Sequence, residues 1–460
     1  MVWVLTVFLL SGCAVGPEFK EPPVETPGAY RTQVKPTDTA ADLRWWELFD
    51  DPILVDLVME ALKNNRDIRV AASRIEQARA TVGFTRADRY PRLDGDAGAY
   101  TGNFNGGSRS PDTTASVYLA APLTWEIDFW GKFKRSTDAA RAELMATEFG
   151  HKAAQLALVA EVASVYNQLL DSHRRLAISR STFESREESL IIIQQRFEKG
   201  IIGELDVNQA QIQKEIAAAS IPFYQRAIAK AENGLSILLG SLPETIRIGK
   251  NLVGASPPEI PVGMPADILT RRPDVLQAKY LLKAQNEAIG VAMALRLPAI
   301  SLTGSLGVAS SDLGNITTEG GVWSIGGRLL GPIVDFGKNK RRVEIEALKM
   351  QQALYQYENT VLTAFREVED ALVSIVTYRQ ELAALERQQK AARNASMLSR
   401  ERYDKGVSSY LEVLDTDRTL FNVDLNHSEL QQQYLNAYVG LYKALGGGWI
   451  TPAEMKAARR

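Results

Sequence analysis

The chain has 460 residues, of which 45% are hydrophobic and 23% are charged, and this is long enough for two or three ordinary folded domains. The 53 lysine and arginine residues nearly balance the 55 aspartate and glutamate residues, so the net charge of -2 does not point to a nucleic-acid partner. The chain contains no uninterrupted apolar stretch of about 18 residues, and the sequence therefore predicts no transmembrane helix.

The N-terminal residues 1–12 are apolar and uncharged, and they end before Cys13, the only cysteine in the chain. Residues 10–13 read Leu-Ser-Gly-Cys and look like a bacterial lipobox, although a basic region before the apolar run is missing. We therefore predict a lipoprotein signal peptide over 1–12 and an acyl chain such as palmitate on Cys13. A buried strand that ends in cysteine is the alternative. The proline-rich residues 13–44 are predicted to form a lipid-anchored extended segment.

Residues 45–240 are predicted to form a first structural repeat, with helices, two strands and a helical hairpin. The strands are expected at about 92–104 and about 116–129, where apolar and polar side chains alternate with period two. Segments of roughly 10–13 residues with one apolar face suit tilted membrane-spanning strands. Two ordinary hairpins packed on a soluble core are the alternative interpretation.

A very long helix is predicted from about 131 to 199, because this span lacks proline and is rich in spaced alanine residues. At about 1.5 Å per residue it would be about 100 Å long, which is typical of a coiled coil or a helical barrel. A tight hairpin tip is expected at about 199–205, with Gly200 as the turn residue and a second helix from about 205 to 239. A plain antiparallel coiled coil without a channel remains open at this stage.

Residues 241–264 are predicted to be a linker or equatorial segment, 265–446 a second structural repeat, and 447–460 a C-terminal equatorial tail. The second repeat is expected to contain strands at about 299–309 and about 321–334 and a hairpin tip at about 405–411 that turns at Gly406. The two halves correspond with a shift of about 207 residues, which is far longer than a solenoid unit. The positions that recur are Asp67, Gly83, Arg89 and Pro91 as Asp274, Gly290, Arg296 and Pro298.

The four predicted strands cannot close a barrel within one chain, and a bilayer does not tolerate open sheet edges. Copies of the chain would therefore have to contribute strands jointly. Two copies would give eight strands with a filled interior, whereas three copies would give twelve strands with room for a pore.

This pattern resembles the TolC-like outer membrane factors, and in particular the lipoprotein branch that works with resistance-nodulation-division (RND) pumps. The likeness covers nearly the whole chain. Its most specific stretches are Trp45-Trp46 with Asp51-Pro52, then Leu269 with Arg271-Arg272-Pro273-Asp274, and residues 297–304.

The resemblance implies a mixed α and β membrane protein. It would be a homotrimer with a 12-stranded outer-membrane β-barrel, four strands per chain, continuous with a long α-helical periplasmic barrel. The implied function is the outer membrane channel of a tripartite efflux system, with a periplasmic adaptor protein and an inner-membrane RND-type transporter as partners. The outlet of a type I protein secretion system and, in a different class, a non-conducting periplasmic scaffold are the alternatives.

The second hairpin tip carries the residues that we expect to act. Glu412 and Asp415 are three positions apart and so share a helix face, and in a threefold assembly they would form carboxylate rings that favour cations. Leu411 would add an apolar constriction to this periplasmic gate. Two exposed acids that merely solvate the start of a helix are the alternative.

The resemblance also implies a hydrogen bond between Tyr403 and Asp206 that holds the hairpins shut, and it places Ser408 where some relatives carry a latch arginine.

Enzyme chemistry has no support in the sequence. The three histidines, His151, His173 and His427, lack ligand spacing, and a solvated helix face is expected for each. The sequence contains no phosphate-binding loop, dinucleotide fingerprint or nucleophile–base pair, so we expect no catalytic residue, metal or cofactor.

Overall fold

The computed structural model describes residues 14–32, 46, 49–105, 108–249, 267–311 and 321–447. The predicted signal peptide, Cys13, and most of the predicted linker and C-terminal tail lie outside the described residues. The chain divides into two compact units. One comprises Met1–Val24, Ser73–Phe149 and Gln277–Asn359, and the other comprises Glu25–Ala72, Gly150–Leu276 and Thr360–Arg460.

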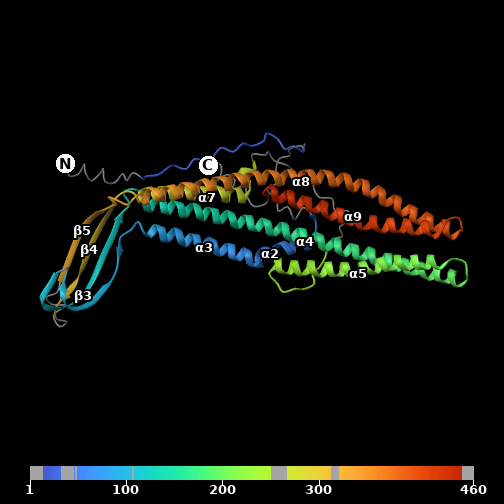
Figure 1. Ribbon diagram of the computed structural model, residues 1–460, viewed down its shortest axis with the longest axis horizontal. Coiled ribbons are helices and arrows are strands. Elements are labelled where there is room, and N and C mark those ends of the chain that lie inside the picture. The colour runs from blue at the N-terminus through green and yellow to red at the C-terminus, as the bar shows by residue number, and fades with distance from the viewer. Residues whose placement is uncertain are drawn as a thin grey trace. The chain divides into compact units, whose positions relative to one another are not determined.

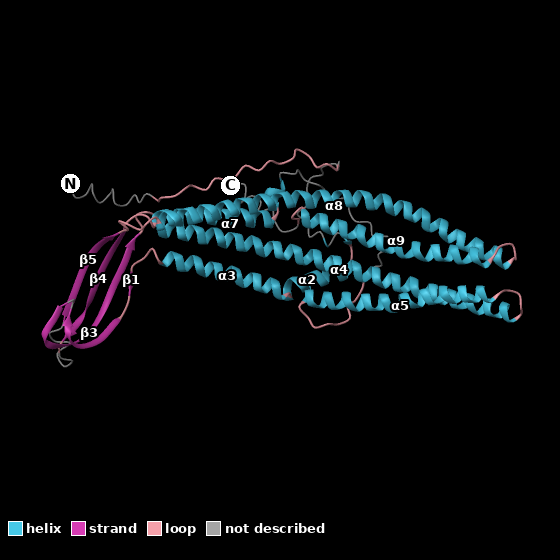
Figure 2. Ribbon diagram, viewed as in Figure 1, coloured by secondary structure: helices cyan, strands magenta, loops and turns pink. Residues whose placement is uncertain are grey.

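The described elements follow one order twice along the chain (Figures 1 and 2). The first half contains α2 (Pro52–Asn64), α3 (Arg66–Ala87), β1 (Arg92–Leu93), β2 (Asp96–Asn105), β3 (Ser108–Ile127), α4 (Lys132–Glu198) and α5 (Glu204–Leu239). The second contains α6 (Ile268–Arg271), α7 (Pro273–Ala294), β4 (Ala299–Ser310), β5 (Gly321–Leu330), α8 (Lys338–Asp404) and α9 (Tyr410–Ala444).

The lengths of three pairs of equivalent helices agree closely. Helices α4 and α8 both have 67 residues, α3 and α7 both have 22, and α5 and α9 have 36 and 35. The long helices begin at equivalent corners, because Asp128 accepts hydrogen bonds from the Phe133 and Lys134 amides and Asp335 accepts them from the Gly337 and Asn339 amides. A carboxylate at this position satisfies amides that have no partner within the helix.

The strands form one antiparallel sheet in the order β1-β3-β4-β5, with β2 also paired to β3. Strand β1 and residues 96–102 of β2 pair with β3 in one register on either side of residues 94–95, so β1 continues the line of β2. The register of β2 against β3 shifts between Gly102 and Phe104. Strand β3 begins at Ser108, earlier than the predicted 116. Strand β5 ends at Leu330 and not at the predicted 334. The residues that follow are Gly331 and Pro332, and proline cannot donate to a strand ladder.

One face of this sheet carries large apolar side chains that are exposed in the single chain. Residues paired directly across antiparallel strands share a face, so Leu306 lies on the same face as its partners Ala121 and Trp323. The exposed apolar side chains of this face are Leu119, Leu123, Leu302, Leu306, Trp323, Ile325 and Leu329. The opposite face carries most of the polar side chains, among them Thr124, Glu126, Ser301, Thr303, Ser324 and Arg328.

Residues 14–24, which we call the N-terminal strap, are seated in the same unit as the sheet. The Val15 amide donates to the Trp130 carbonyl at 3.1 Å, just after the end of β3. The Arg135 guanidinium donates to the Val15 carbonyl at 3.3 Å and forms a nearly buried ion pair with Glu287 at 2.6 Å. From α7, the Asn286 amide donates to the Pro17 carbonyl at 3.1 Å, so side chains of both α4 and α7 hold the strap.

In the second unit, buried Arg272 joins the beginning of α7 to the end of α9. Its Nη1 donates to the Ala444 carbonyl at 3.0 Å, and its Nη2 lies 2.7 Å from carboxylate oxygens of both Asp274 and Glu367. Charge-assisted hydrogen bonds of this kind satisfy a guanidinium that burial removes from water. The Arg-Pro-Asp sequence that carries the family resemblance thus has a structural role.

Candidate functional site

The two helical hairpins, α4–α5 and α8–α9, turn in the same way, and their tips lie side by side within the second unit (Figure 1). Gly200 and Gly406 have φ angles of 71° and 74°, a conformation that strains other residues. In each turn the glycine amide and the next amide bond back to the end of the long helix, from Ile201 to Arg196 and from Val407 to Arg402, both at 2.9 Å. This is the glycine-terminated helix end that the Lys-Gly pairs predicted.

Helix α9 begins at the second tip and presents two different faces. Tyr410, Val413 and Leu414 are buried, whereas Leu411, Glu412 and Asp415 are exposed, with 62% of Leu411 accessible. The spacing of a helix separates these two sets, because positions three and four apart share a face. The three predicted gate residues therefore lie together on the face of α9 that is not packed within the chain.

Both acids of this face have an arginine partner in the same chain. Arg402 Nε lies 3.2 Å from Glu412 Oε1, and Arg418 Nη2 lies 2.7 Å from Asp415 Oδ1. Exposed pairs of this kind contribute about 0–1 kcal/mol and are screened by salt. The sequence analysis did not identify these arginines. The spacing of three between Asp415 and Arg418 was visible in the sequence, whereas the pair of Arg402 and Glu412 spans the turn.

An apolar cluster joins the two hairpins beneath this face. It combines α4, α5 and α9, and Tyr403 at the end of α8 packs against it. The buried members are Leu190, Ile193, Ala210, Tyr410, Val413 and Leu414. Burial raises the pKa of Tyr410 to about 12. Hydrophobic contacts thus hold the tips of the two hairpins together within the chain.

The hydrogen bond that we predict between Tyr403 and Asp206 is not present within the single chain. The Tyr403 hydroxyl is buried and has no hydrogen-bond partner among the described residues. The Tyr403 ring instead packs under the Arg196 guanidinium at 4.7 Å, and Arg196 pairs with Asp404 at 3.3 Å. This cation–π contact and ion pair hold the ring in place without using its hydroxyl. The Ser408 hydroxyl is also buried and unpartnered in the described part of the chain.

Further along, polar side chains connect α4 to α9. Asn167 donates to Asn436 at 2.9 Å, and the buried Asp171 accepts from Ser428 at 2.6 Å. Burial raises the pKa of Asp171, and its bonds to Ser428 and Arg175 only partly offset this effect. Pairing of this kind depends on the relative position of two helices and leaves no local pattern in the sequence.

The prediction that His427 lies on a solvated helix face is wrong. Its side chain is only 8% exposed, whereas a solvated helix face was expected. It lies on the buried side of α9 beside Ser428 and Leu430. Burial lowers the pKa of His427, and the positive charge of Arg174 acts in the same direction.

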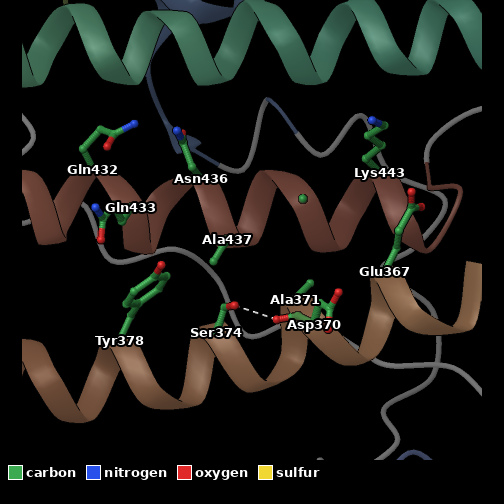
Figure 3. A pocket seen from close by; sticks show the side chains of 11 residues that line it. Glu367, Asp370, Ala371, Ser374, Tyr378, Gln432, Gln433, Asn436, Ala437 and Lys443 are labelled. Carbon is green, nitrogen blue, oxygen red and sulfur yellow. Dashed lines mark hydrogen bonds between the residues drawn. The ribbon is translucent and has the colours of Figure 1, made fainter. Parts of the chain in front are cut away.

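A polar groove with a volume of about 440 Å³ lies between α8 and α9 (Figure 3). Figure 3 shows Glu367 and Lys443 at one end of the groove and Tyr378 and Gln433 at the other. No histidine or cysteine lines it, and the hydroxyl of Ser374 on α8 donates to a backbone carbonyl of its own helix at 2.6 Å. The groove offers hydrogen-bonding groups rather than a nucleophile with a base.

Within the described residues, no three or more His, Cys, Asp or Glu side chains are placed to hold a metal ion. The helices described here include none that is long and apolar enough to cross a membrane.

Comparison with known proteins gives consistent matches. The family described as outer membrane efflux protein matches residues 57–241 and again residues 264–447. The chain is 36% identical over 464 residues to the toluene efflux pump outer membrane protein TtgI of Pseudomonas putida, covering 97% of each chain. It is 32% identical to the probable outer membrane lipoprotein SilC of Salmonella typhimurium, covering 97% of this chain and 98% of that protein. The solved structure of the Campylobacter jejuni CmeC outer membrane channel is similar with a TM-score of 0.87 and 26% identity, over 97% of this chain and 98% of CmeC.

Proposed function

The chain belongs to the outer membrane efflux protein family, and from this premise we propose that it is the outer membrane channel of a tripartite efflux system. The resemblance recognised in the sequence is thereby confirmed. The channel would passively conduct substrates that an inner-membrane RND-type transporter and a periplasmic adaptor protein deliver to it. The match of the family to both halves supports two internal structural repeats.

The observation that carries this proposal is the exposed apolar face of a sheet with two open edges. Strands β2 and β5 each have a free side in the described part of the chain. Unpaired strand edges and a large apolar surface both require a covering environment. A closed barrel in a bilayer provides it, because the edges pair between copies and the apolar face meets lipid.

Three copies would close the barrel with four strands from each chain, if β1 and β2 are counted as one strand. A barrel of twelve strands leaves room for a pore. The hairpins of the three chains would then form the periplasmic helical barrel. The mass of the detergent-purified protein tests this assembly. Native mass spectrometry is expected to give three subunits, whereas a stable folded monomer contradicts it.

The gate of this channel would be the exposed face of α9 at the second tip. Leu411, Glu412 and Asp415 are free of packing within the chain, so they are available to face the threefold axis. Like charges gathered there attract cations and impede anions. The intrachain partners Arg402 and Arg418 reduce this charge, so the selectivity would reflect a balance of acids and arginines.

Planar-bilayer recordings of the purified channel test both the pore and the gate. The double variant E412Q/D415N should lose part of the cation preference and of the block by multivalent cations while remaining trimeric. The matched control is E401Q, because Glu401 is exposed in the same hairpin but belongs to α8. Unchanged selectivity in the double variant would place the gate elsewhere.

We also propose that Cys13 is acylated and anchors the protein in the outer membrane. The position of the N-terminal strap supports this proposal, because the hydrogen bond from Val15 to Trp130 places the first described residues beside the end of β3. A mature N-terminus at an acylated Cys13 is expected in mass spectrometry of membrane-extracted protein. An unmodified Met1 terminus overturns it.

The substrate class that we propose is organic solutes, as the name of TtgI indicates for that relative. The outlet channel of a type I protein secretion system is the second candidate function, because such a channel would be a similar trimer. A non-conducting scaffold predicts no channel events in the same bilayer recordings.

A further inference from the structure

A polar cavity of about 190 Å³ lies behind the apolar cluster of the hairpin tips, between α4, α8 and α9. It is lined by two arginines, Arg186 and Arg400, and by the carboxylates of Asp417 and Asp424. Four hydroxyl side chains complete its polar wall, those of Ser181, Thr182, Ser185 and Ser396. Neither the proposed channel nor the gate uses this cavity.

Arg186 is a buried cation without a direct counter-ion. Only 5% of the residue is exposed, and no carboxylate of the described residues is recorded within ion-pair distance of it. Its Nη1 donates to the Gln213 carbonyl at 2.6 Å, and the guanidinium lies 5.0 Å from the ring centre of Phe421. Its Nη2 is buried and has no hydrogen-bond partner in the described chain. A guanidinium stays charged in proteins, so burial cannot be relieved by loss of a proton.

The nearby carboxylates are engaged by other groups. Asp417 is bound to Arg400 at 2.7 Å and to the Ser396 hydroxyl at 2.5 Å. Asp424 accepts from Gln389 at 2.7 Å and lies 3.6 Å from Arg393.

Arg400 itself is only partly satisfied. Its Nη2 donates to Asp417 and to the Ser185 hydroxyl, but its Nε is buried without a partner among the described residues. Asp417 thus pairs with Arg400 and not with Arg186, and both guanidinium groups retain a buried N–H donor that has no partner among the described residues. Such donors are costly unless something accepts from them.

We propose that this cavity is a binding site for a small inorganic anion, which bridges Arg186 and Arg400. Chloride and phosphate share the required chemistry, a negative charge with several acceptor positions for N–H and O–H donors. A volume of about 190 Å³ accommodates either ion together with water. The bound anion supplies the missing counter-charge and fastens α4 to α8 and α9 next to the tip cluster.

The stability of the purified full-length protein tests the site. At constant ionic strength, replacing sodium gluconate by sodium chloride should raise the midpoint of thermal unfolding by about 2–4 °C and should saturate with concentration. A parallel series with sodium phosphate distinguishes the two anions, because the effect of the anion that binds more tightly saturates at the lower concentration. The variant R186M should abolish the saturable rise. The matched control R180M should keep it, because Arg180 is exposed on the same helix. An equal response in R186M and wild type overturns the proposal.

Bromide anomalous diffraction from crystals of the wild-type protein gives a direct readout that does not depend on any variant. The expected result is a bromide peak between the guanidinium groups of Arg186 and Arg400. Bromide found only at exposed arginines would indicate an adventitious ion only, and this overturns the proposal. Loss of this site would leave channel conductance intact. Failure of the anion-site proposal is therefore distinguishable from failure of the proposed channel function.

Discussion

Gly16 and Gly290 pack backbone against backbone, and a Cβ on Gly16 would lie 2.5 Å from the Cα of Gly290. A Cβ on Gly290 would lie 3.0 Å from the Arg135 side chain and from the Val15 carbonyl. The seat of the N-terminal strap therefore requires glycine on α7. Because the strap follows the proposed lipid site, this contact fixes where the anchor joins the folded body.

The variant G290A should loosen the strap. Alanine favours a helix by about 1 kcal/mol over glycine, but here its methyl group displaces Arg135 or Val15. Limited proteolysis is expected to cut residues 14–24 faster than in wild type. The control is G83A at the equivalent position of α3, where a Cβ meets nothing within 4 Å. A strap equally protected in both variants contradicts the prediction.

A charge on the apolar face of the sheet should prevent membrane assembly. Ile325 lies near the centre of β5 on that face, and its neighbour Ser324 lies on the other. The variant I325R should reduce the amount of trimer in the outer membrane fraction, because an arginine facing lipid costs about 2–4 kcal/mol. The variant S324R should assemble normally. Equal loss in both variants would show that the two faces do not differ in environment.

Replacing Tyr403 by Phe should leave the chain as stable as wild type or more stable. The hydroxyl has no partner in the described chain, so its removal relieves a buried unsatisfied group and retains the ring contacts. Thermal unfolding and bilayer conductance are the measurements. A lower unfolding midpoint together with higher resting conductance would show that the hydroxyl bonds to another subunit in the assembly.

Acid should destabilise the hairpin packing through His427. Burial and the nearby Arg174 lower the pKa of His427 in the folded chain, so the folded state favours the neutral imidazole. The stability that depends on this neutral form is fully present above the unfolded pKa of about 6.5 and is lost as pH falls through the lower folded value. The acidic neighbours Glu386 and Asp424 oppose the shift but do not cancel it.

The variant H427Q should therefore lose less stability than wild type when the pH is lowered from about 7.5 to about 5.5. The midpoint of thermal unfolding at each pH is the measurement. An identical pH dependence in the two proteins would assign the acid sensitivity to other groups.

The elements that depend on neighbours along the chain could be predicted from the sequence. The absence of proline and the periodic apolar residues predicted helices close to α4 and α8, and the Lys-Gly pairs predicted turns at Gly200 and Gly406. Period-two alternation predicted the strands and identified the apolar face. These features are local, because backbone conformation and the side on which a residue points follow from spacing.

The groups that meet across elements could be identified only from the packing of the helices and strands in the folded chain. This packing paired β3 with β4, buried His427, and gave Glu412 and Asp415 arginine partners. Among the described residues of the single chain it left the Tyr403 hydroxyl without a partner. It also left Arg186, beside a cavity, without a direct counter-ion among the described residues. Such contacts depend on the rotation and register of long helices against one another. A change of one residue in that register redirects a side chain by about 100°, which the sequence alone does not specify.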